Sequence, residues 1–194
     1  MLMNNHKMIA DYILDNMRDD RLHLINRKRF IWGNIKPDCA SRYKFKKHYY
    51  NESIDMVVEM IEKLSSLSIS EINNESSIGK FSGVLGVVCH FLTDYYCLPH
   101  HQRWEFKNAM RPHVVYEREL SKVSKNYKVN VIKNNNLKAS NIREFIDGTL
   151  EIYAIDQSFE NDLNFAYYVC SSILDMIIES VVQNEININN RIAM

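Results

Sequence analysis

The chain has 194 residues, of which 46% are hydrophobic and 25% charged. Basic and acidic residues both number 24, so the formal net charge at pH 7 is zero. This composition indicates a compact domain with a hydrophobic core and excludes a disordered or collagen-like chain. A neutral chain also argues against a strongly basic nucleic-acid-binding surface or a polybasic membrane anchor. We therefore expect a single domain over residues 1–194 and no nucleic-acid partner.

Glycine and proline are scarce, at 5 and 3 residues, which disfavours the many turns of a β-sandwich or barrel. Apolar residues instead recur at helical spacing, which predicts an all-α bundle of about six helices. In chain order these stretches span 8–17, 54–64, 81–96, 114–120, 142–153 and 163–181. Three polar or irregular segments are predicted to be loops, and the tail from residue 187 is expected to fray. The predicted loops are 32–50, 65–79 and 124–140.

The opening MLMNNHKMIADYIL has no charged segment followed by an apolar run, so we expect no signal peptide. No run reaches the roughly 18 apolar residues that span a bilayer, and the longest, 81–92, is interrupted by Gly83, Gly86 and His90. We therefore expect a cytoplasmic protein without a transmembrane segment. The four cysteines form no CxxC motif and are expected to be reduced, buried thiols. They are Cys39, Cys89, Cys97 and Cys170. The pattern gives no indication of the oligomeric state.

Histidine and acidic residues recur at spacings that suit metal binding. His90 and Asp94 lie four residues apart in the 81–96 helix, and His113 and Glu117 repeat that spacing. Residues four apart share one helix face, so each pair can bind a single ion. His6 lies on the apolar side of the first helix and is expected to face the core. The complete series of candidate ligands is His6, Asp38, His48, His90, Asp94, His100, His113 and Glu117.

A lone histidine on an apolar face, or one such pair, is common in helical proteins that bind no metal. Eight ligand-type residues on or beside buried helix faces are harder to explain as ordinary core, and they predict a metal site. Imidazole and carboxylate groups suit zinc or a similar borderline divalent ion. His101 is next to His100 and could be the ligand in its place, although the spacing from Asp94 favours His100. His23 is expected to be exposed, and Lys46 and Lys47 either form a solvated face or steer an anionic substrate.

The order of these residues resembles the bacterial zinc-dependent phospholipase C family. The opening NHKMIADYIL is similar to the first helix of that family, and GVVCHFLTDYYCLPH is similar to its central metal-binding helix. The resemblance covers about residues 6–120 and implies an all-α fold with a cluster of zinc ions. It assigns one zinc to Asp38, His48, His90 and Asp94, a second to His100, His113 and Glu117, and a third to His6 with the bridging Asp94.

The third site departs from the family pattern. In the family this ion also takes the amino group of a mature N-terminal tryptophan, and this sequence has no tryptophan near its start. The site is therefore expected to be weak, to use the amine of Met1, or to be empty. We accordingly expect two or three zinc ions.

The resemblance also implies an activity, namely hydrolysis of a phosphodiester by a zinc-activated water that Asp38 orients or deprotonates. The expected substrate is a phospholipid or a related phosphodiester. One alternative is a single-strand nuclease-like zinc phosphodiesterase, which zero net charge disfavours. The others are a non-catalytic zinc-stabilised helical protein and a helical bundle that binds no metal. A count of bound metal and an assay of phosphodiester hydrolysis distinguish these alternatives.

Overall fold

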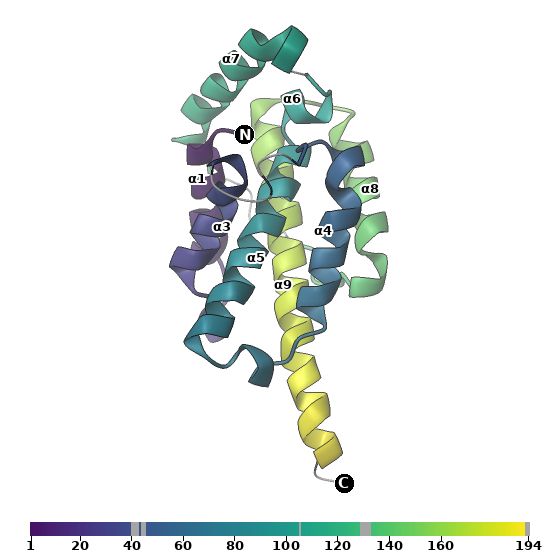
Figure 1. The fold of residues 1–194 in the computed structure, drawn as a ribbon. Coiled ribbons are helices and arrows are strands. Elements are labelled where there is room, and N and C mark those ends of the chain that lie inside the picture. The colour runs from purple at the N-terminus through teal and green to yellow at the C-terminus, as the bar shows by residue number, and fades with distance from the viewer. Residues whose placement is uncertain (40–42, 44–45, 105, 129–132, 193–194) are drawn as a thin grey trace.

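The computed structural model describes residues 1–39, 43, 46–104, 106–128 and 133–192. Within these ranges the chain forms nine α-helices, two short 3₁₀ helices and no strand (Figure 1), which confirms the predicted all-α class. The α-helices are α1 (Met3–Asp15), α2 (Asp19–Leu22), α3 (Arg27–Cys39), α4 (Tyr50–Ser65), α5 (Glu75–Tyr95), α6 (Leu98–His101), α7 (Phe106–Ser124), α8 (Ile142–Tyr153) and α9 (Phe159–Ile192).

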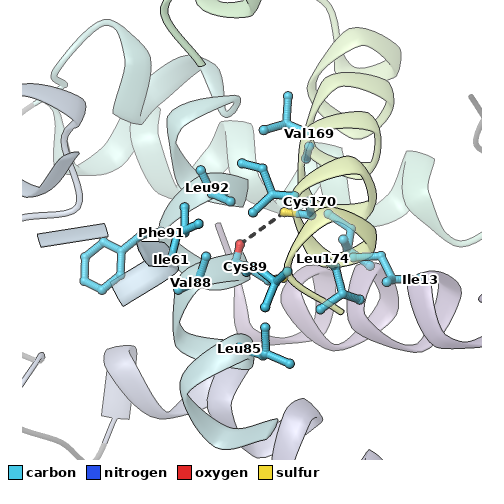
Figure 2. Packing of buried hydrophobic residues seen from close by; sticks show 14 of the residues in the cluster. Ile13, Ile61, Leu85, Val88, Cys89, Phe91, Leu92, Val169, Cys170 and Leu174 are labelled. Carbon is cyan, nitrogen blue, oxygen red and sulfur yellow. Dashed lines mark hydrogen bonds between the residues drawn. The ribbon is translucent and has the colours of Figure 1, made fainter. Parts of the chain in front are cut away.

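Helix α9 forms the axis of the molecule. It packs against α1, α4, α5, α7 and α8, and its C-terminal turns extend beyond the other helices in Figure 1. Helix α5 lies alongside it, and the two meet at Cys170, whose thiol donates a 3.5 Å hydrogen bond to the carbonyl oxygen of Cys89. Leu92 and Leu174 are buried at the same contact (Figure 2). These two largely buried helices form a rigid centre on which the shorter helices are placed.

The contact between α3 and α5 is closer than side chains would allow. A Cβ atom on Gly33 would lie 2.3 Å from the carbonyl oxygen of Gly83, and one on Gly86 would lie 2.2 Å from that of Phe30. Real Cβ atoms do not approach other atoms so closely, so both positions require glycine. The two helices therefore touch backbone to backbone, and α3 packs more extensively on α5 than on any other described element.

Helix α3 corrects the prediction of a loop over 32–50. Its buried residues are Phe30, Gly33, Asn34 and Pro37, which have the helical spacing i, i+3, i+4 and i+7. Only Phe30 is a large apolar residue, so the helix shows no hydrophobic stripe in the sequence. Residues 40–42 and 44–45 of the predicted loop lie outside the described part of the chain.

Helix boundaries also differ from the predictions, and two of the differences extend helices into segments that were predicted to be loop or to fray. Helix α5 begins at Glu75, inside the predicted loop 65–79, because the side chain of Asn74 accepts a hydrogen bond from the N–H of Ser77 and caps the helix. Helix α9 continues through the Asn-rich stretch after residue 187 as far as Ile192. The six predicted stretches correspond to α1, α4, α5, α7, α8 and α9, and α2, α3 and α6 were not predicted.

The expectations about membrane-spanning segments and about the cysteines are each met in part. By length and composition, α9 is apolar enough to cross a membrane, although 67% of its most apolar 18-residue window is buried within the fold. Such burial is typical of a central core helix. Three of the cysteines are buried as expected, whereas Cys39, at the end of α3, is exposed. All four are free thiols.

Replacing Gly86 by alanine should force α3 and α5 apart. Because the added methyl group would overlap backbone atoms of α3, we expect Gly86→Ala to lower the free energy of unfolding by about 3 kcal/mol. Urea denaturation followed by circular dichroism measures this loss. Gly148→Ala in α8 is the matched control, since a Cβ atom there would meet nothing within 4 Å. It should be neutral or stabilise by up to about 1 kcal/mol. Equal stability of the two variants would contradict the close contact.

Candidate metal centre

All eight candidate ligands from the sequence meet at one end of the bundle. They come from α1, α3, α5, α6 and α7, together with the segment between α3 and α4 that carries His48. Figure 1 shows α1, α6 and α7 close to the N-terminus at this end. Residues separated by up to 111 positions, His6 and Glu117, thus belong to one cluster. Their roles as ligands stay predictions, and the distances between their donor atoms describe what the cluster can bind.

The first group surrounds one carboxylate oxygen of Asp94. Oδ2 of Asp94 lies 2.9 Å from Nδ1 of His48 and 3.4 Å from Nε2 of His90. Those two ring nitrogens are themselves 3.2 Å apart. Oδ1 of Asp38 lies 3.6 Å from Nε2 of His90 and 3.7 Å from Nδ1 of His48. His48, His90 and Asp94 therefore present three donor atoms within 4.8 Å of one another, and Asp38 lies beside both histidines. Three protein ligands with a fourth nearby suit a tetrahedral cation.

The second group is built on Glu117 in α7. Its Oε1 lies 3.1 Å from Nε2 of His113, one helical turn earlier, and 3.2 Å from Nε2 of His100 in α6. The neighbouring His101 instead packs edge-on against the ring of Tyr153, with 5.1 Å between the ring centroids. The structure thus places His100 in the cluster and His101 outside it. This group offers two imidazoles and one carboxylate to an ion.

Asp94 faces both groups and also contacts the residues proposed for a third ion. Its Oδ1 lies 3.3 Å from Nε2 of His6 and contacts the amino group of Met1. That amino group is 3.2 Å from both Nε2 of His100 and Oε1 of Glu117. The amine therefore lies between the two groups and beside the oxygen of Asp94 that faces His6.

Backbone carbonyl groups orient two of the histidines. Nδ1 of His90 lies 2.7 Å from the carbonyl oxygen of Asn34, and Nδ1 of His113 lies 3.2 Å from that of Trp104. A carbonyl oxygen only accepts, so both Nδ1 atoms must carry the proton. The lone pair is then on Nε2, the atom that faces the acidic residues. Such outer hydrogen bonds fix the tautomer of a metal-binding histidine.

The pKa values of His90 and Asp94 both depart from their usual values. It lowers the pKa of His90 well below its usual value, and the nearby His6 lowers that pKa further. Burial acts to raise the pKa of Asp94, but His100 and the Met1 amine outweigh it and hold this pKa well below its usual value. At neutral pH His90 is therefore neutral and Asp94 is ionised, and these are the protonation states in which the two residues ligate a divalent cation.

Unpartnered polar atoms give an independent test of whether the residues fit a metal. Both ring nitrogens of the fully buried His6 and Nδ1 of His100 are buried without a hydrogen-bond partner. Leaving such atoms desolvated and unpaired is costly, and coordination to a cation removes the cost. The cluster contains three sets of residues, and within each set the donor atoms lie within 4.8 Å of one another. They are His6, Asp38 and His90; His48, His90 and Asp94; and His100, His113 and Glu117. The residues fit a cluster of metal ions.

A cavity of about 470 Å³ opens onto this cluster. Asp38, His48, His100, His113 and Glu117 line it, so donor atoms of both groups are exposed to a molecule bound there. The cluster lies at the base of an accessible pocket, which is what a catalytic metal site needs and a closed structural site lacks.

Comparison with known proteins identifies the family. The model of the family described as zinc dependent phospholipase C matches residues 5–160. The chain belongs to the zinc-dependent phospholipase C family. No curated protein and no solved structure matched the sequence. The family match includes all eight candidate ligands, and it confirms the resemblance that the spacing of these residues suggested.

Asp162 connects helices that carry candidate ligands from outside the cluster, and no sequence pattern predicted this role. This buried carboxylate in α9 accepts hydrogen bonds from the hydroxyl groups of Tyr153, at 2.5 Å, and Tyr116, at 3.0 Å. It also accepts a 3.3 Å bond from the N–H of Leu98. One side chain therefore connects α9 to α6, α7 and α8. A single acidic residue in an apolar helix has no spacing that predicts such a role.

The stability of the protein should depend on pH through Asp162. Burial raises the pKa of Asp162 to about 7, whereas an aspartate in an unfolded chain ionises near pH 4. As pH rises from 4 to 7 the unfolded state loses this proton first, so the free energy of unfolding falls by on the order of 3 kcal/mol. Asp162→Asn removes this contribution. The stability of the wild type relative to the variant should therefore decrease over that range.

Urea denaturation in the presence of a chelator, at intervals from pH 4.5 to 7.5, measures this difference. Asp19→Asn on the exposed helix α2 is the control for loss of an acidic residue. A difference between wild type and Asp162→Asn that stays constant with pH would show that the buried carboxyl is already ionised at pH 4.5.

Proposed function

We propose that this protein is a zinc-dependent phosphodiester hydrolase of the phospholipase C type, which cleaves a phospholipid or a related phosphodiester. The observation that carries the proposal is the convergence of two donor groups at the base of one cavity, with Asp94 facing both. The family match supports the reaction class. Neither a cluster of ion pairs nor a closed structural zinc site requires an adjoining cavity, whereas a catalytic site does.

Zinc would be held in two or three positions. Asp38, His48, His90 and Asp94 would bind the first ion, and His100, His113 and Glu117 the second. His6 and Asp94 would hold a third, with the Met1 amine as a further donor. The amine contacts Asp94 as a protonated group, and it would have to lose its proton to become a second donor, after His6, besides the bridging carboxylate.

Zinc in such a site offsets the charge of phosphate oxygens and acidifies water, so that a nucleophile is available near neutral pH. The chain must place the substrate and accept a proton from the attacking water. Asp38 is the best candidate for this step because 27% of its side chain is exposed and it lines the cavity, whereas Asp94 is fully buried. Water adds to phosphorus, the bond to the leaving oxygen breaks, and the products are an alcohol and a phosphomonoester.

Asp38→Asn should abolish most of the turnover and preserve the fold. Asparagine is nearly isosteric with aspartate but cannot accept the proton, so we expect kcat to fall by at least about 100-fold. Hydrolysis of a soluble chromogenic phosphodiester by the zinc-loaded protein measures kcat, and circular dichroism verifies the fold. Asp19→Asn should retain the activity. Full activity of Asp38→Asn would rule out the proposed role.

His113→Gln should remove one equivalent of zinc and leave the first group occupied. The second group would then retain only His100 and Glu117, too few protein ligands for tight binding. Elemental analysis after purification without chelators measures the zinc content. His23→Gln, at an exposed position outside the cluster, is the control. Equal zinc content in all three proteins would contradict the assignment, and absence of zinc from the wild type would favour a bundle that binds no metal.

A nuclease-like activity is tested with the same preparation. Single-stranded DNA, lecithin and the soluble chromogenic ester are compared as substrates at equal zinc. Faster cleavage of DNA than of the other two would replace the phospholipase proposal by the nuclease alternative. Bound zinc without hydrolysis of any of them would identify a zinc-stabilised, non-catalytic protein.

A further inference from the structure

The cavity above the cluster has a cationic rim. Lys46 and Lys47, which directly precede His48, line the same cavity as the ligands. Both side chains are exposed, so they are free to move towards a bound molecule. Because a concave site between low-dielectric walls concentrates an electrostatic field, two lysines at its entrance affect binding more than two lysines on an open surface.

The acidic residues nearby do not neutralise this rim. Oε1 of Glu52 accepts a hydrogen bond from Arg103 and lies 3.8 Å from Nζ of Lys47, so two cations share one carboxylate. No carboxylate in the described part of the chain pairs with Lys46. These four side chains carry three positive charges and one negative charge, an excess of two positive charges. The two carboxylates that line the cavity, Asp38 and Glu117, already face histidines of the cluster.

The aromatic ring at the cavity is already engaged by a cation. Tyr49 lines the cavity, and the guanidinium of Arg103 lies 5.2 Å from the centroid of its ring. A quaternary ammonium group binds proteins best over an exposed aromatic face with a carboxylate nearby. Here Arg103 occupies one face of the ring and holds Glu52. This arrangement disfavours a cationic headgroup such as choline at Tyr49.

A further part of the cavity is apolar. Leu2 and Met3 at the start of α1, together with Pro37 in α3, line it. These residues offer no hydrogen-bonding side chains and suit the hydrocarbon portion of a substrate. The cavity therefore combines an apolar wall, a cluster of candidate metal ligands and a cationic rim, a combination that suits an amphiphilic molecule.

We propose that the substrate is an amphiphilic phosphodiester whose retained alcohol carries a second anionic group, and that this group binds against Lys46 and Lys47. This inference rests on the proposed phosphodiester hydrolase function and specifies its substrate class. The apolar alcohol, the leaving group, lies against the wall formed by Leu2, Met3 and Pro37. Lys46 and Lys47 are then residues that determine specificity and do not take part in bond cleavage.

A series of three soluble esters isolates the effect of charge. Each is a 4-nitrophenyl phosphodiester, and the second alcohol is choline, ethanol or ethylene glycol monophosphate, so the side group is cationic, neutral or dianionic. The zinc-loaded wild type should show the highest kcat/KM for the dianionic ester and the lowest for the choline ester. The preference should weaken as salt is raised, because both lysines are exposed.

Substitution of the lysines should remove the preference. In the double variant Lys46→Gln/Lys47→Gln we expect the ratio of kcat/KM between the dianionic and choline esters to fall roughly five- to tenfold. The ethanol ester should be hydrolysed almost as well as by the wild type. Lys63→Gln on α4, where the lysine pairs with Glu59 one turn earlier, is the matched control. An unchanged ratio in the double variant, or a wild type that prefers the choline ester, would overturn the inference.

Binding measurements separate this inference from the proposed function. Hydrolysis-resistant phosphonate analogues of the three esters are titrated into the zinc-loaded protein by calorimetry. If no ester is hydrolysed, the hydrolase function fails, while tighter binding of the dianionic analogue that depends on the two lysines still supports the rim as an anion site. Equal affinity for all three analogues overturns the inference whether or not the protein is a hydrolase.

The second anionic group could belong to a lipid headgroup or to a nucleotide. A short-chain diacylglycerol ester with a phosphorylated headgroup is therefore compared with a 5′-phosphorylated dinucleotide. The apolar wall predicts a higher kcat/KM for the lipid. A higher value for the dinucleotide would overturn the amphiphilic substrate class.

Discussion

The backbone contact between α3 and α5 determines where the candidate ligands meet. Gly33 and Gly86 leave no side chain between the helices, so the carbonyl oxygen of Asn34 reaches Nδ1 of His90. His90 lies one turn after Gly86 on α5, and Asp38 lies just over one turn after Gly33 on α3. The same contact therefore turns Nε2 of His90 towards the cluster and brings Asp38 beside it. A methyl group at either glycine would disturb both ligands together, so packing and metal chemistry depend on one constraint.

Charge compensation is the second requirement of this end of the molecule. Asp94 is fully buried beside His90, and Glu117 is nearly buried beside His100. Burial lowers the pKa of both of these imidazoles. The Met1 amine, which contacts both carboxylates, offsets only part of the cost of burying them. Cations in the cluster would offset the remainder and would satisfy the unpartnered nitrogens of His6. Folding of this region and metal binding are therefore expected to be coupled.

The sequence predicted those features that repeat with a period. Helices α4 and α8 have regular apolar stripes, so the all-α class could be predicted. The pairs His90–Asp94 and His113–Glu117 have the spacing of one helix face, which is why the series of candidate ligands could be proposed. Helix α3 could not, because the residues it buries are mainly glycine, asparagine and proline. The group that orients His90 is the backbone carbonyl of Asn34, and because every residue has such a carbonyl the sequence could not indicate its role. Distances between ligands on different helices depend on the glycine contact, which no periodicity reveals.

The zero net charge of the chain conceals a local positive charge at the cavity. The equal numbers of acidic and basic residues argued against a nucleic-acid partner. These totals do not distinguish buried charges in the cluster from exposed charges at the rim of the cavity. The acidic residues of the site lie within the cluster, where histidines and cations would neutralise them, whereas Lys46 and Lys47 are exposed at its rim. A substrate approaching the cavity therefore meets positive charge even though the chain is neutral. Because fields decay within a Debye length of about 8 Å at physiological salt, the proposed selection would depend on this rim and not on the total charge.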